Sequence, residues 1–291
     1  MRYFIRGSTL FIRGSFLAAS TGVNGGLRRI STILNHTVAL DWDHQEPFRS
    51  MERIVSEQGL PRDFFGLLTA VEMRNLCILH FDFITAFITA GVSNPNPEPP
   101  HTINIVIHSS EGLSEGAILE TIITATEAKT RALQLMGYTF TGTTTDEVVV
   151  ACEGDVHHVY AGTLTEVGKR VYAAVLFGVQ EALKRHEEMV HRTEPSLFIH
   201  SRYDGSHWVE WSAKDCPYFP CHFQGQSCSY CYCPFYPCRD EGLGQWVESS
   251  SGGTVWSCSQ CTLLHIPDVA AYLKKNPEAT LRELRAVSER L

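Results

Sequence analysis

Eight of the ten cysteines in this 291-residue chain lie between Cys216 and Cys261, whereas Cys77 and Cys152 stand alone. Cysteines gathered in so short a segment are typical of a small domain held by metal ions or disulfides, because its own apolar core is too small to fold it. The chain therefore divides into a long region of ordinary composition and a short cysteine-rich region.

The composition of the whole chain excludes several classes of protein. Lys and Arg number 24 and Asp and Glu number 32, so the net charge is 24 − 32 = −8, without basic blocks. This argues against nucleic-acid binding. A hydrophobic content of 44% suffices for a large core and excludes a mainly disordered chain. No stretch approaches the roughly 20 apolar residues of a membrane span, and Arg6 and Arg13 interrupt the first twenty residues. We therefore expect a cytoplasmic protein without membrane insertion.

The long region alternates strand and helix patterns, which predicts a layered α/β domain. Two extended segments are expected in the first twenty residues, joined near Gly7, and residues 93–100 are expected to be a proline-rich loop. Ser114 and Thr165 are placed to begin two helices. Further strands are expected at residues 64–71, 77–81, 84–90, 102–108 and 148–152, and helices at 50–60, 114–136 and 165–191.

Six segments of this region, in order, resemble adenosylcobinamide amidohydrolases, the CbiZ family. They are Ser20–Gly26, Gly66–Val71, Thr89–Asn94, Thr102–Val106, Thr124–Thr130 and Thr141–Asp146. The resemblance implies hydrolysis of the amide that joins aminopropanol to the corrin ring of adenosylcobinamide. The product, adenosylcobyric acid, would re-enter cobalamin biosynthesis, so the implied role is corrinoid salvage. The element order is also similar to that of self-cleaving aminopeptidases and ornithine acetyltransferases, which implies an αββα-like sandwich.

Amide hydrolysis needs a base, an acid for the leaving amine and donors for the oxyanion. Asp146, after a Gly-Thr turn at the mouth of a strand, is the first candidate for the base, with a structural aspartate as the alternative. Glu127, in the middle of a helix, is a candidate if its side chain is buried and trivial if it is solvated. Thr69, at a strand end, is a candidate nucleophile or an ordinary strand threonine. We expect no cofactor in catalysis.

Substrate-binding groups are expected in two turns. Asn24, Gly25 and Gly26 can adopt positive φ and direct backbone N–H groups at one point, or they can form an ordinary tight turn. The second turn offers three hydroxyl groups, those of Thr143, Thr144 and Thr145. His80 and His108 lie on predicted buried strands and are interpreted as core residues. No Gly-x-Ser-x-Gly elbow, phosphate-binding loop or His-Glu-x-x-His motif occurs.

The cysteine-rich region resembles a small, zinc-binding domain. Two Cys-x-x-Cys pairs and two pairs separated by four residues would fill two tetrahedral zinc sites. The predicted ligands are Cys216, Cys221, Cys228, Cys231, Cys233, Cys238, Cys258 and Cys261. The alternatives are one zinc with free thiols, substitution by His222 or His265, a disulfide knot and an iron–sulfur centre. Because thiolate sites of this kind have no open position, the metal is expected to be structural.

We therefore expect an amidohydrolase domain at residues 1–195, a linker at 196–212 and a cysteine-rich module at 213–291 that ends in two short helices. The module is expected to dock partners or to support a homo-oligomer. Two alternatives stay open. The long region could bind a corrinoid without cleaving it, or it could be a Thr- or Ser-nucleophile hydrolase of peptide or acyl-amino-acid amides that cleaves its own chain.

Overall fold

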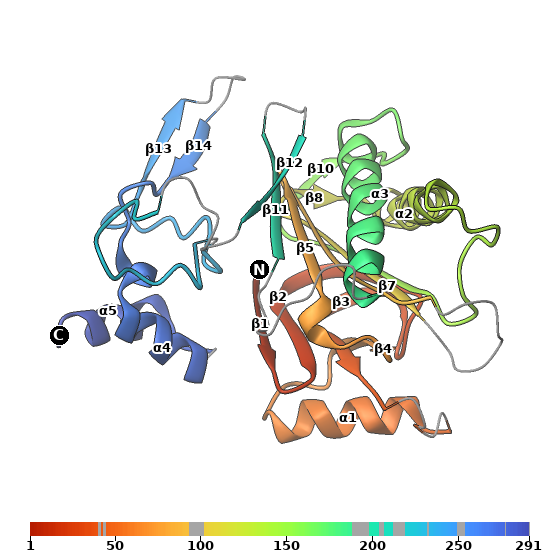
Figure 1. Cartoon of the computed structure of the whole chain (residues 1–291), viewed down its shortest axis with the longest axis horizontal. Helices are drawn as coiled ribbons and strands as arrows, with labels where there is room; N and C mark the ends of the chain where they lie inside the picture. The colour runs from red at the N-terminus through yellow and green to blue at the C-terminus, as the bar shows by residue number, and fades with distance from the viewer. Residues whose placement is uncertain are drawn as a thin grey trace. The chain divides into compact units, whose positions relative to one another are not determined.

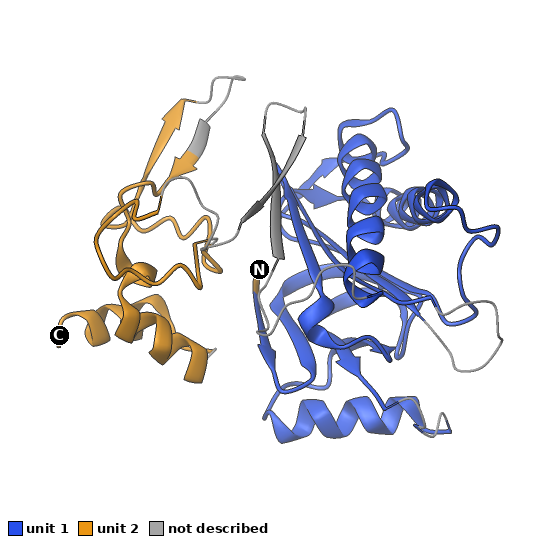
Figure 2. Cartoon of the chain, in the orientation of Figure 1, with its two compact units in different colours: residues 1, 3–210 blue, residues 2, 211–291 orange. Residues whose placement is uncertain are grey.

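The computed structural model covers the whole chain and contains two compact units (Figure 2). One unit comprises Met1 and Tyr3–Glu210, and the other comprises Arg2 and Trp211–Leu291. The structure describes residues 1–39, 42, 45–92, 102–187, 198–203, 207–211, 219–231, 233–248, 254–276 and 278–290. The loop predicted at residues 93–100 and the metal ligand predicted at Cys216 lie outside these ranges.

The first unit is built on a ten-stranded mixed sheet with the order β12-β11-β5-β6-β7-β9-β2-β3-β4, in which β1 also pairs with β2. The strands are β1 (Arg2–Arg6), β2 (Thr9–Ser20), β3 (Gly26–Thr37), β4 (Phe64–Thr69), β5 (Cys77–Phe81), β6 (Ile84–Ala90), β7 (Ile103–Ser109), β9 (Glu147–Cys152), β11 (Phe198–Tyr203) and β12 (His207–Trp211). Two short strands, β8 (Gly112–Leu113) and β10 (Val156–His158), pair apart from this sheet. The strands expected from the sequence are all present.

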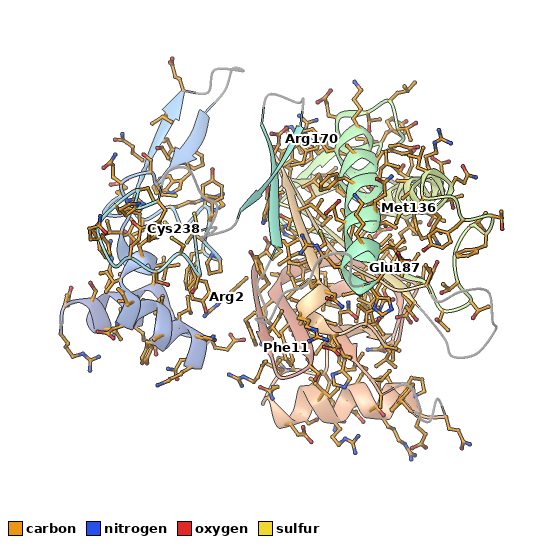
Figure 3. The ribbon with its side chains drawn as sticks, viewed as in Figure 1. Arg2, Phe11, Met136, Arg170, Glu187 and Cys238 are labelled. Atoms are coloured by element: carbon orange, nitrogen blue, oxygen red, sulfur yellow. The ribbon has the colours of Figure 1, made fainter. Side chains whose placement is uncertain are left out.

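The helices lie on two sides of the sheet (Figure 1). They are α1 (Pro47–Glu57), α2 (Glu115–Leu135) and α3 (Glu166–His186), and a 3₁₀ turn, η1, spans Met73–Asn75. The helices α2 and α3 share one apolar core with β5, β6, β7 and β9. On the other side, Met51 and Val55 of α1 pack with residues of β2, β3 and β4 that include Phe11 (Figure 3).

Side chains that meet across the sheet show that it curls over on itself. Asn35 on β3 donates to Thr89 on β6 at 3.0 Å, and Asn104 on β7 donates to Asn35 at 3.0 Å. The half that carries β3 and β4 therefore faces the half that carries β6 and β7. The layers follow the predicted αββα-like order, although both inner layers belong to one continuous sheet.

The helix ends follow the chemistry that the sequence predicts. The side chains of Ser114 and Thr165 accept hydrogen bonds from the backbone N–H groups of Ala117 and Gly168, which caps α2 and α3. After α2, Gly137 has a φ of 90°, a conformation that glycine adopts without a steric penalty. The predicted extension of α3 to His191 falls beyond the described residues, which end at Glu187 in this part of the chain.

Two strands occupy the range where a linker was predicted. In residues 196–212, β11 adds to the edge of the sheet by parallel pairing with β5, and β12 pairs with β11. The contacts divide the chain after Glu210, so the first unit extends beyond residue 195. The sequence Phe198–Tyr203 is rich in aromatic and β-branched residues, which strands favour.

The second unit combines irregular segments with a small helical core. It contains the hairpin β13 (Gln245–Glu248) and β14 (Thr254–Ser257), the 3₁₀ turn η2 (Leu263–His265), and the helices α4 (Pro267–Lys275) and α5 (Leu281–Ser288). Leu264, Leu273 and Leu284 lie in its buried core. The two predicted C-terminal helices are confirmed. Within the described ranges of the whole chain, no helix has the length and apolar character needed to cross a membrane.

Candidate active site

Most of the segments that carry the sequence resemblance meet at one end of the curled sheet. The strands β2 and β6 end there, and the parallel strands β7 and β9 begin there, so that Ser20 pairs with Val149, Thr89 with Asn104, and Asn104 with Glu147. The end of β4 reaches the same region through Leu68, whose backbone bonds to Glu147 and Asn104. The segment on α2 reaches this end through Lys129, which binds Asp146 at the start of β9. Segments separated by more than a hundred residues in the chain therefore build one region.

Side chains complete the hydrogen bonding of β4 along the edge that no full strand covers. Gly66 forms two backbone hydrogen bonds with Val23, of 2.8 and 3.0 Å. Further along, the Leu68 N–H donates to Glu147 Oε2 at 3.2 Å, and Asn104 Nδ2 donates to the Leu68 carbonyl oxygen at 2.9 Å. The side chains of Glu147 and Asn104, which are register partners on β9 and β7, thus take the place of a neighbouring strand.

Asn104 belongs to a buried polar cluster with Asn35 and Thr89. All three residues are at most 2% exposed. Asn104 donates to Asn35 and Asn35 donates to Thr89. Asn104 Oδ1 is buried and has no hydrogen-bond partner among the described residues. A buried acceptor without a partner costs about 1–3 kcal/mol, which proteins tolerate chiefly at sites where a ligand or water satisfies it.

The carboxyl group of Glu147 is partly buried beside this cluster. Burial is the main cause that raises its pKa to about 7, and the hydrogen bond from the Leu68 N–H opposes the shift. Gly22 lies against the carboxyl group, because a Cβ atom on this glycine would be 3.2 Å from Glu147 Oε1. The residue keeps part of its surface accessible. A carboxyl group with this pKa exchanges a proton near neutral pH, as a general acid or base must.

Asp146 points away from Glu147 and is held by several donors. Lys129 Nζ lies 2.5 Å from Asp146 Oδ2, and both side chains are 9% exposed. The backbone N–H and hydroxyl groups of Thr143 and the N–H of Ile103 also donate to the carboxylate. This environment favours the structural interpretation that the sequence left open for Asp146.

The two other predicted catalytic residues, Glu127 and Thr69, lie in different parts of the first unit. Glu127 is exposed on the outer face of α2, the solvated position for which a catalytic role was not expected. Thr69 is 1% exposed at the end of β4, where its hydroxyl group accepts a hydrogen bond from the Val71 N–H at 3.1 Å. Of these two residues, Thr69 is the one near Glu147, because the N–H of the preceding residue, Leu68, donates to the Glu147 carboxyl group.

The turn at Asn24–Gly26 follows part of the prediction. Asn24 and Gly26 have positive φ values of 59° and 112°, whereas Gly25 lies outside that region. Arg28 donates to the carbonyl oxygens of Asn24 and Gly25, and Asn24 Nδ2 donates to the Phe64 carbonyl oxygen at 2.8 Å. The turn is therefore anchored to β4.

The threonine turn contributes both internal and exposed groups. Thr143 binds Asp146, and the hydroxyl groups of Thr145 and Thr102 are 2.7 Å apart. Thr144 and Thr145 are exposed. These two residues are therefore accessible to a ligand, whereas Thr143 is engaged in holding the start of β9.

A second polar cluster lies at the opposite end of β9. Glu153 is 3.1 Å from His108 and 2.7 Å from the amino group of Met1. Burial alone would raise the pKa of Glu153, but His108 and the amino group lower it to about 2. Burial lowers the pKa of His80 to about 3 and also lowers that of His108, so both histidines are core residues as predicted.

A group outside the predicted residues has the composition of a metal site. The ligand atoms of Glu111, His157 and His158 all lie within 4.8 Å of one another. Glu111 Oε2 and His158 Nε2 are 2.6 Å apart, so a hydrogen bond already joins two of the three side chains.

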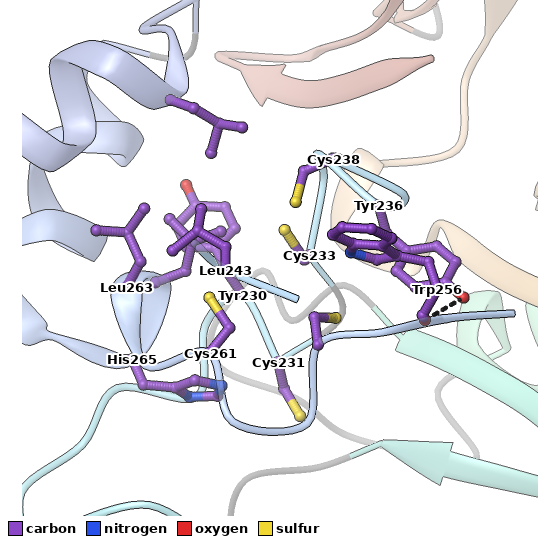
Figure 4. A pocket seen from close by; sticks show the side chains of 13 residues that line it. Tyr230, Cys231, Cys233, Tyr236, Cys238, Leu243, Trp256, Cys261, Leu263 and His265 are labelled. Atoms are coloured by element: carbon purple, nitrogen blue, oxygen red, sulfur yellow. Dashed lines mark hydrogen bonds between the residues drawn. The ribbon is translucent and has the colours of Figure 1, made fainter. Parts of the chain in front are cut away.

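The cysteines of the second unit form two groups. Cys233, Cys238, Cys258 and Cys261 interact electrostatically, and five cysteines line one pocket with Tyr230, Trp256 and Leu263 (Figure 4). Burial raises the pKa of the Cys233 thiol to about 12, and the neighbouring thiols add to the shift. The Phe235 N–H donates to Cys233 Sγ at 3.4 Å.

The second group of cysteines is joined by Gln226, which donates to Cys221 Sγ at 3.3 Å and to Cys228 Sγ at 3.2 Å. The rings of His222 and His265 lie next to each other, with centroids 4.4 Å apart. All described cysteines are free thiols. The donor set therefore fits a thiolate-binding metal, and it offers no support within the described residues for the disulfide alternative.

Comparisons with known proteins agree with this division of the chain. Residues 11–191 match the family model described as adenosylcobinamide amidohydrolase, and residues 207–288 match the model described as cysteine-rich small domain. The adenosylcobinamide amidohydrolase of Methanosarcina mazei is 41% identical over 200 residues, which cover 65% of this chain and all of the relative. The chain belongs to the adenosylcobinamide amidohydrolase family.

Another amidohydrolase and a protein with a different name are each similar to part of the chain. The adenosylcobinamide amidohydrolase of Halobacterium salinarum is 33% identical over 182 residues, 56% of this chain and 78% of the relative. A probable cobalt-factor III C(17)-methyltransferase of Methanothermobacter thermautotrophicus is 41% identical over 64 residues, 22% of this chain and 17% of the relative. No solved structure matches the chain.

The amidohydrolase unit contains site residues that the sequence did not single out, namely Glu147, Asn104 and Asn35. A signal for Glu147 was present, because neighbouring strand residues face opposite sides of a sheet. With Asp146 facing the helices, Glu147 must face the interior. Asn35 and Asn104 are amides in otherwise apolar strands, which is a signal for a buried polar cluster.

Proposed function

We propose that this chain hydrolyses the amide between aminopropanol and the corrin ring of adenosylcobinamide, giving adenosylcobyric acid and aminopropanol in corrinoid salvage. The observation that carries the proposal is the convergence of the resemblance segments on one end of the sheet, beside a partly buried carboxyl group and a buried amide cluster. The full-length match to the relative from Methanosarcina mazei supports the choice of substrate.

Incubation of the purified chain with adenosylcobinamide, followed by mass spectrometry of the corrinoids, tests this proposal. We expect adenosylcobyric acid and one equivalent of aminopropanol. Tight corrinoid binding without product would instead support the binding protein. An intact mass that reveals cleavage before a Thr or Ser would support the self-cleaving hydrolase.

Among the predicted residues, we propose substrate binding for Asn24, Gly25, Gly26, Thr144 and Thr145, and a supporting role for Thr143, whose N–H and hydroxyl groups hold Asp146. We also propose that Thr69 binds substrate or acts on it, and that Asp146 holds the start of β9 through Lys129. A corrinoid carries many amide side chains, so neutral donors and acceptors of this kind suit its recognition. Loss of a single oxyanion donor from the Asn24–Gly26 turn would lower the rate by about 10²–10³.

For the cysteine-rich unit, we propose two structural zinc ions and a cytoplasmic location in which the thiols stay reduced. Cys233, Cys238, Cys258 and Cys261 would hold one ion. Cys216, Cys221, Cys228 and Cys231 would hold the other. Four thiolates close a tetrahedral site, and backbone N–H groups that donate to sulfur stabilise such ligands. The ions would supply folding energy and take no part in the hydrolysis.

Metal analysis of the purified protein tests the zinc proposal. We expect about two equivalents of zinc, with one lost in Cys258→Ser and one lost in Cys228→Ser. Cys152→Ala, in the first unit, is the matched control and should keep both. A zinc-free wild-type protein, or bound iron and sulfide in place of zinc, would refute the assignment.

A further inference from the structure

The fold requires a hydrogen-bond acceptor at the position of the Glu147 carboxyl group, but it does not require a charge there. Its hydrogen bond from the Leu68 N–H completes the edge of β4, a task that a neutral amide oxygen would perform equally well. Two cationic side chains from the segments that meet here bind other groups, because Lys129 pairs with Asp146 and Arg28 donates to the carbonyl oxygens of Asn24 and Gly25. No cation pairs with Glu147 among the residues that the structure describes, and a partly buried carboxyl group without a cation is costly, which favours a functional reason for its presence.

The surroundings of this carboxyl group also suit an amide substrate. Gly22 leaves room for it, since a Cβ atom there would approach Glu147 Oε1 to 3.2 Å and the Gly66 carbonyl oxygen to 2.5 Å. Asn104, the register partner of Glu147, contributes a fully buried Oδ1 atom that has no partner in the described part of the chain. An amide N–H of a bound ligand would satisfy such an acceptor.

We propose that Glu147 is the catalytic carboxylate of this amidohydrolase, acting as the general base on water and then as the acid for the leaving amine. The inference rests on the proposed function and adds a residue to it. Glu127 is exposed, Asp146 is bound by Lys129 and three further donors, and Glu153 at the opposite end of β9 pairs with the amino group of Met1 and hydrogen-bonds to His108. Among these carboxylates, Glu147 alone combines partial burial, partial access and freedom from a cation.

The reaction balances without a further reactant. The Glu147 carboxylate takes a proton from water, and the water oxygen forms a bond to the amide carbonyl carbon. The resulting tetrahedral intermediate breaks its C–N bond while the protonated Glu147 returns the proton to the nitrogen. The products are the corrinoid carboxylic acid and the free amine, and the carboxylate is regenerated.

The decisive experiment compares Glu147→Gln with Glu153→Gln in the full chain. We expect Glu147→Gln to lower kcat by about 10²–10⁴, the range for loss of a general acid or base, with corrinoid binding unchanged by absorbance titration. Glu153→Gln alters a carboxylate near the other end of the same strand and should keep kcat within about threefold. Unfolding curves of both variants report whether the fold is intact.

Several outcomes would overturn the assignment. If wild type releases product and Glu147→Gln is as active, the carboxylate is not catalytic although the proposed function stands. If activity instead disappears in His157→Ala and on treatment with a chelator, the chemistry belongs to Glu111, His157 and His158. If wild type releases no product, the proposed function fails together with this role.

The pH dependence of the wild-type enzyme tests the proposal independently of whether the Glu147→Gln variant folds. The base must be ionised, and the pKa of Glu147 is about 7, so kcat/KM should rise about tenfold per pH unit below 7 and level off above it. The Glu147→Asp variant keeps a carboxylate and should retain more activity than Glu147→Gln. A wild-type profile that is flat from pH 5 to 8 would contradict the proposal.

Discussion

Two partly buried glutamates lie at the two ends of strand β9: Glu147 is its first residue and Glu153 follows its last. The surroundings of the two carboxyl groups shift their pKa values in opposite directions. Burial raises the pKa of Glu147 to about 7, whereas His108 and the amino group of Met1 overcome the burial of Glu153 and lower its pKa to about 2. The difference lies in the partners. Within the described ranges, Glu153 binds the amino group of Met1 and His108, whereas the Glu147 carboxyl group accepts a hydrogen bond from one backbone N–H, that of Leu68.

This comparison separates a carboxylate that holds the fold together from one that is available for chemistry. A paired carboxylate is ionised at any physiological pH and cannot exchange a proton in a reaction near neutrality. Asp146 is also held by partners, because Lys129, Thr143 and the Ile103 N–H all donate to its carboxylate. The identity of the residue as acidic therefore says less about its role than the charges that surround it.

The largest expected effect is on stability, and it tests whether the buried ion pair between Lys129 and Asp146, next to Glu147 in the chain, stabilises the first unit. Lys129→Met leaves the Asp146 carboxylate buried without its cation and should destabilise the first unit by about 3–5 kcal/mol. The exposed Lys169, 3.8 Å from Glu166 on α3, provides a matched control, and Lys169→Met should change stability by less than about 0.5 kcal/mol. Urea unfolding followed by circular dichroism measures both, and equal stabilities would refute the structural role of the pair.

The two glutamates should have opposite effects on stability as pH changes. Glu147 holds its proton more tightly in the folded state, so the free energy of unfolding should fall by about 1–3 kcal/mol as pH rises from 4.5 to 7. Glu153 has a lowered pKa, so its contribution is present above pH 4.5 and is lost as pH falls toward 2. Unfolding of Glu147→Gln and Glu153→Gln across this range should remove the respective slope. If the stability of both variants has the same pH dependence, the prediction that the two carboxyl groups have oppositely shifted pKa values is wrong.

Two glycines give the smallest and most local test. A Cβ atom on Gly22 would lie 2.5 Å from the Gly66 carbonyl oxygen, so Gly22→Ala should cost about 1–3 kcal/mol and lower activity by displacing Glu147. Gly154, near Glu153, has a φ of 83° and open space around it. Gly154→Ala should cost about 1 kcal/mol through backbone strain alone and leave activity unchanged. Thermal melts and initial rates of the two variants distinguish these effects.

Much of the fold could be predicted because its signals are local. Ser114, Thr165 and Gly137 mark helix ends by capping chemistry, and runs of β-branched residues such as Ile103–Ser109 mark buried strands. The range 196–212 escaped prediction because β11 is completed by pairing with β5, more than a hundred residues earlier in the chain. The composition of Phe198–Tyr203 favours a strand, but nothing near it in the sequence reveals a partner that lies so far away along the chain.

The site could be predicted only in part, for a related reason. The segments were identified correctly as those of an amidohydrolase, and the turn at Asn24–Gly26 and Thr69 lie at the end of the sheet where they meet. Among the acidic residues, the sequence favoured Asp146 as the base. In the structure Asp146 binds Lys129 of α2, and the next residue, Glu147, faces the interior.

By itself the sequence determined the residue types, the helix and strand positions, the family and the grouping of cysteines in one segment, since these depend on composition, periodicity and short spacing. Only the tertiary structure decided that Asp146 pairs with a cation and that Glu147, among the described residues, does not. Curling of one sheet brings Leu68 beside Glu147 and its strand partner Asn104, while α2 carries Lys129 to Asp146 on the other face. The pKa of a carboxyl group is set by the groups around it in space, and those groups come from parts of the chain that no local pattern connects.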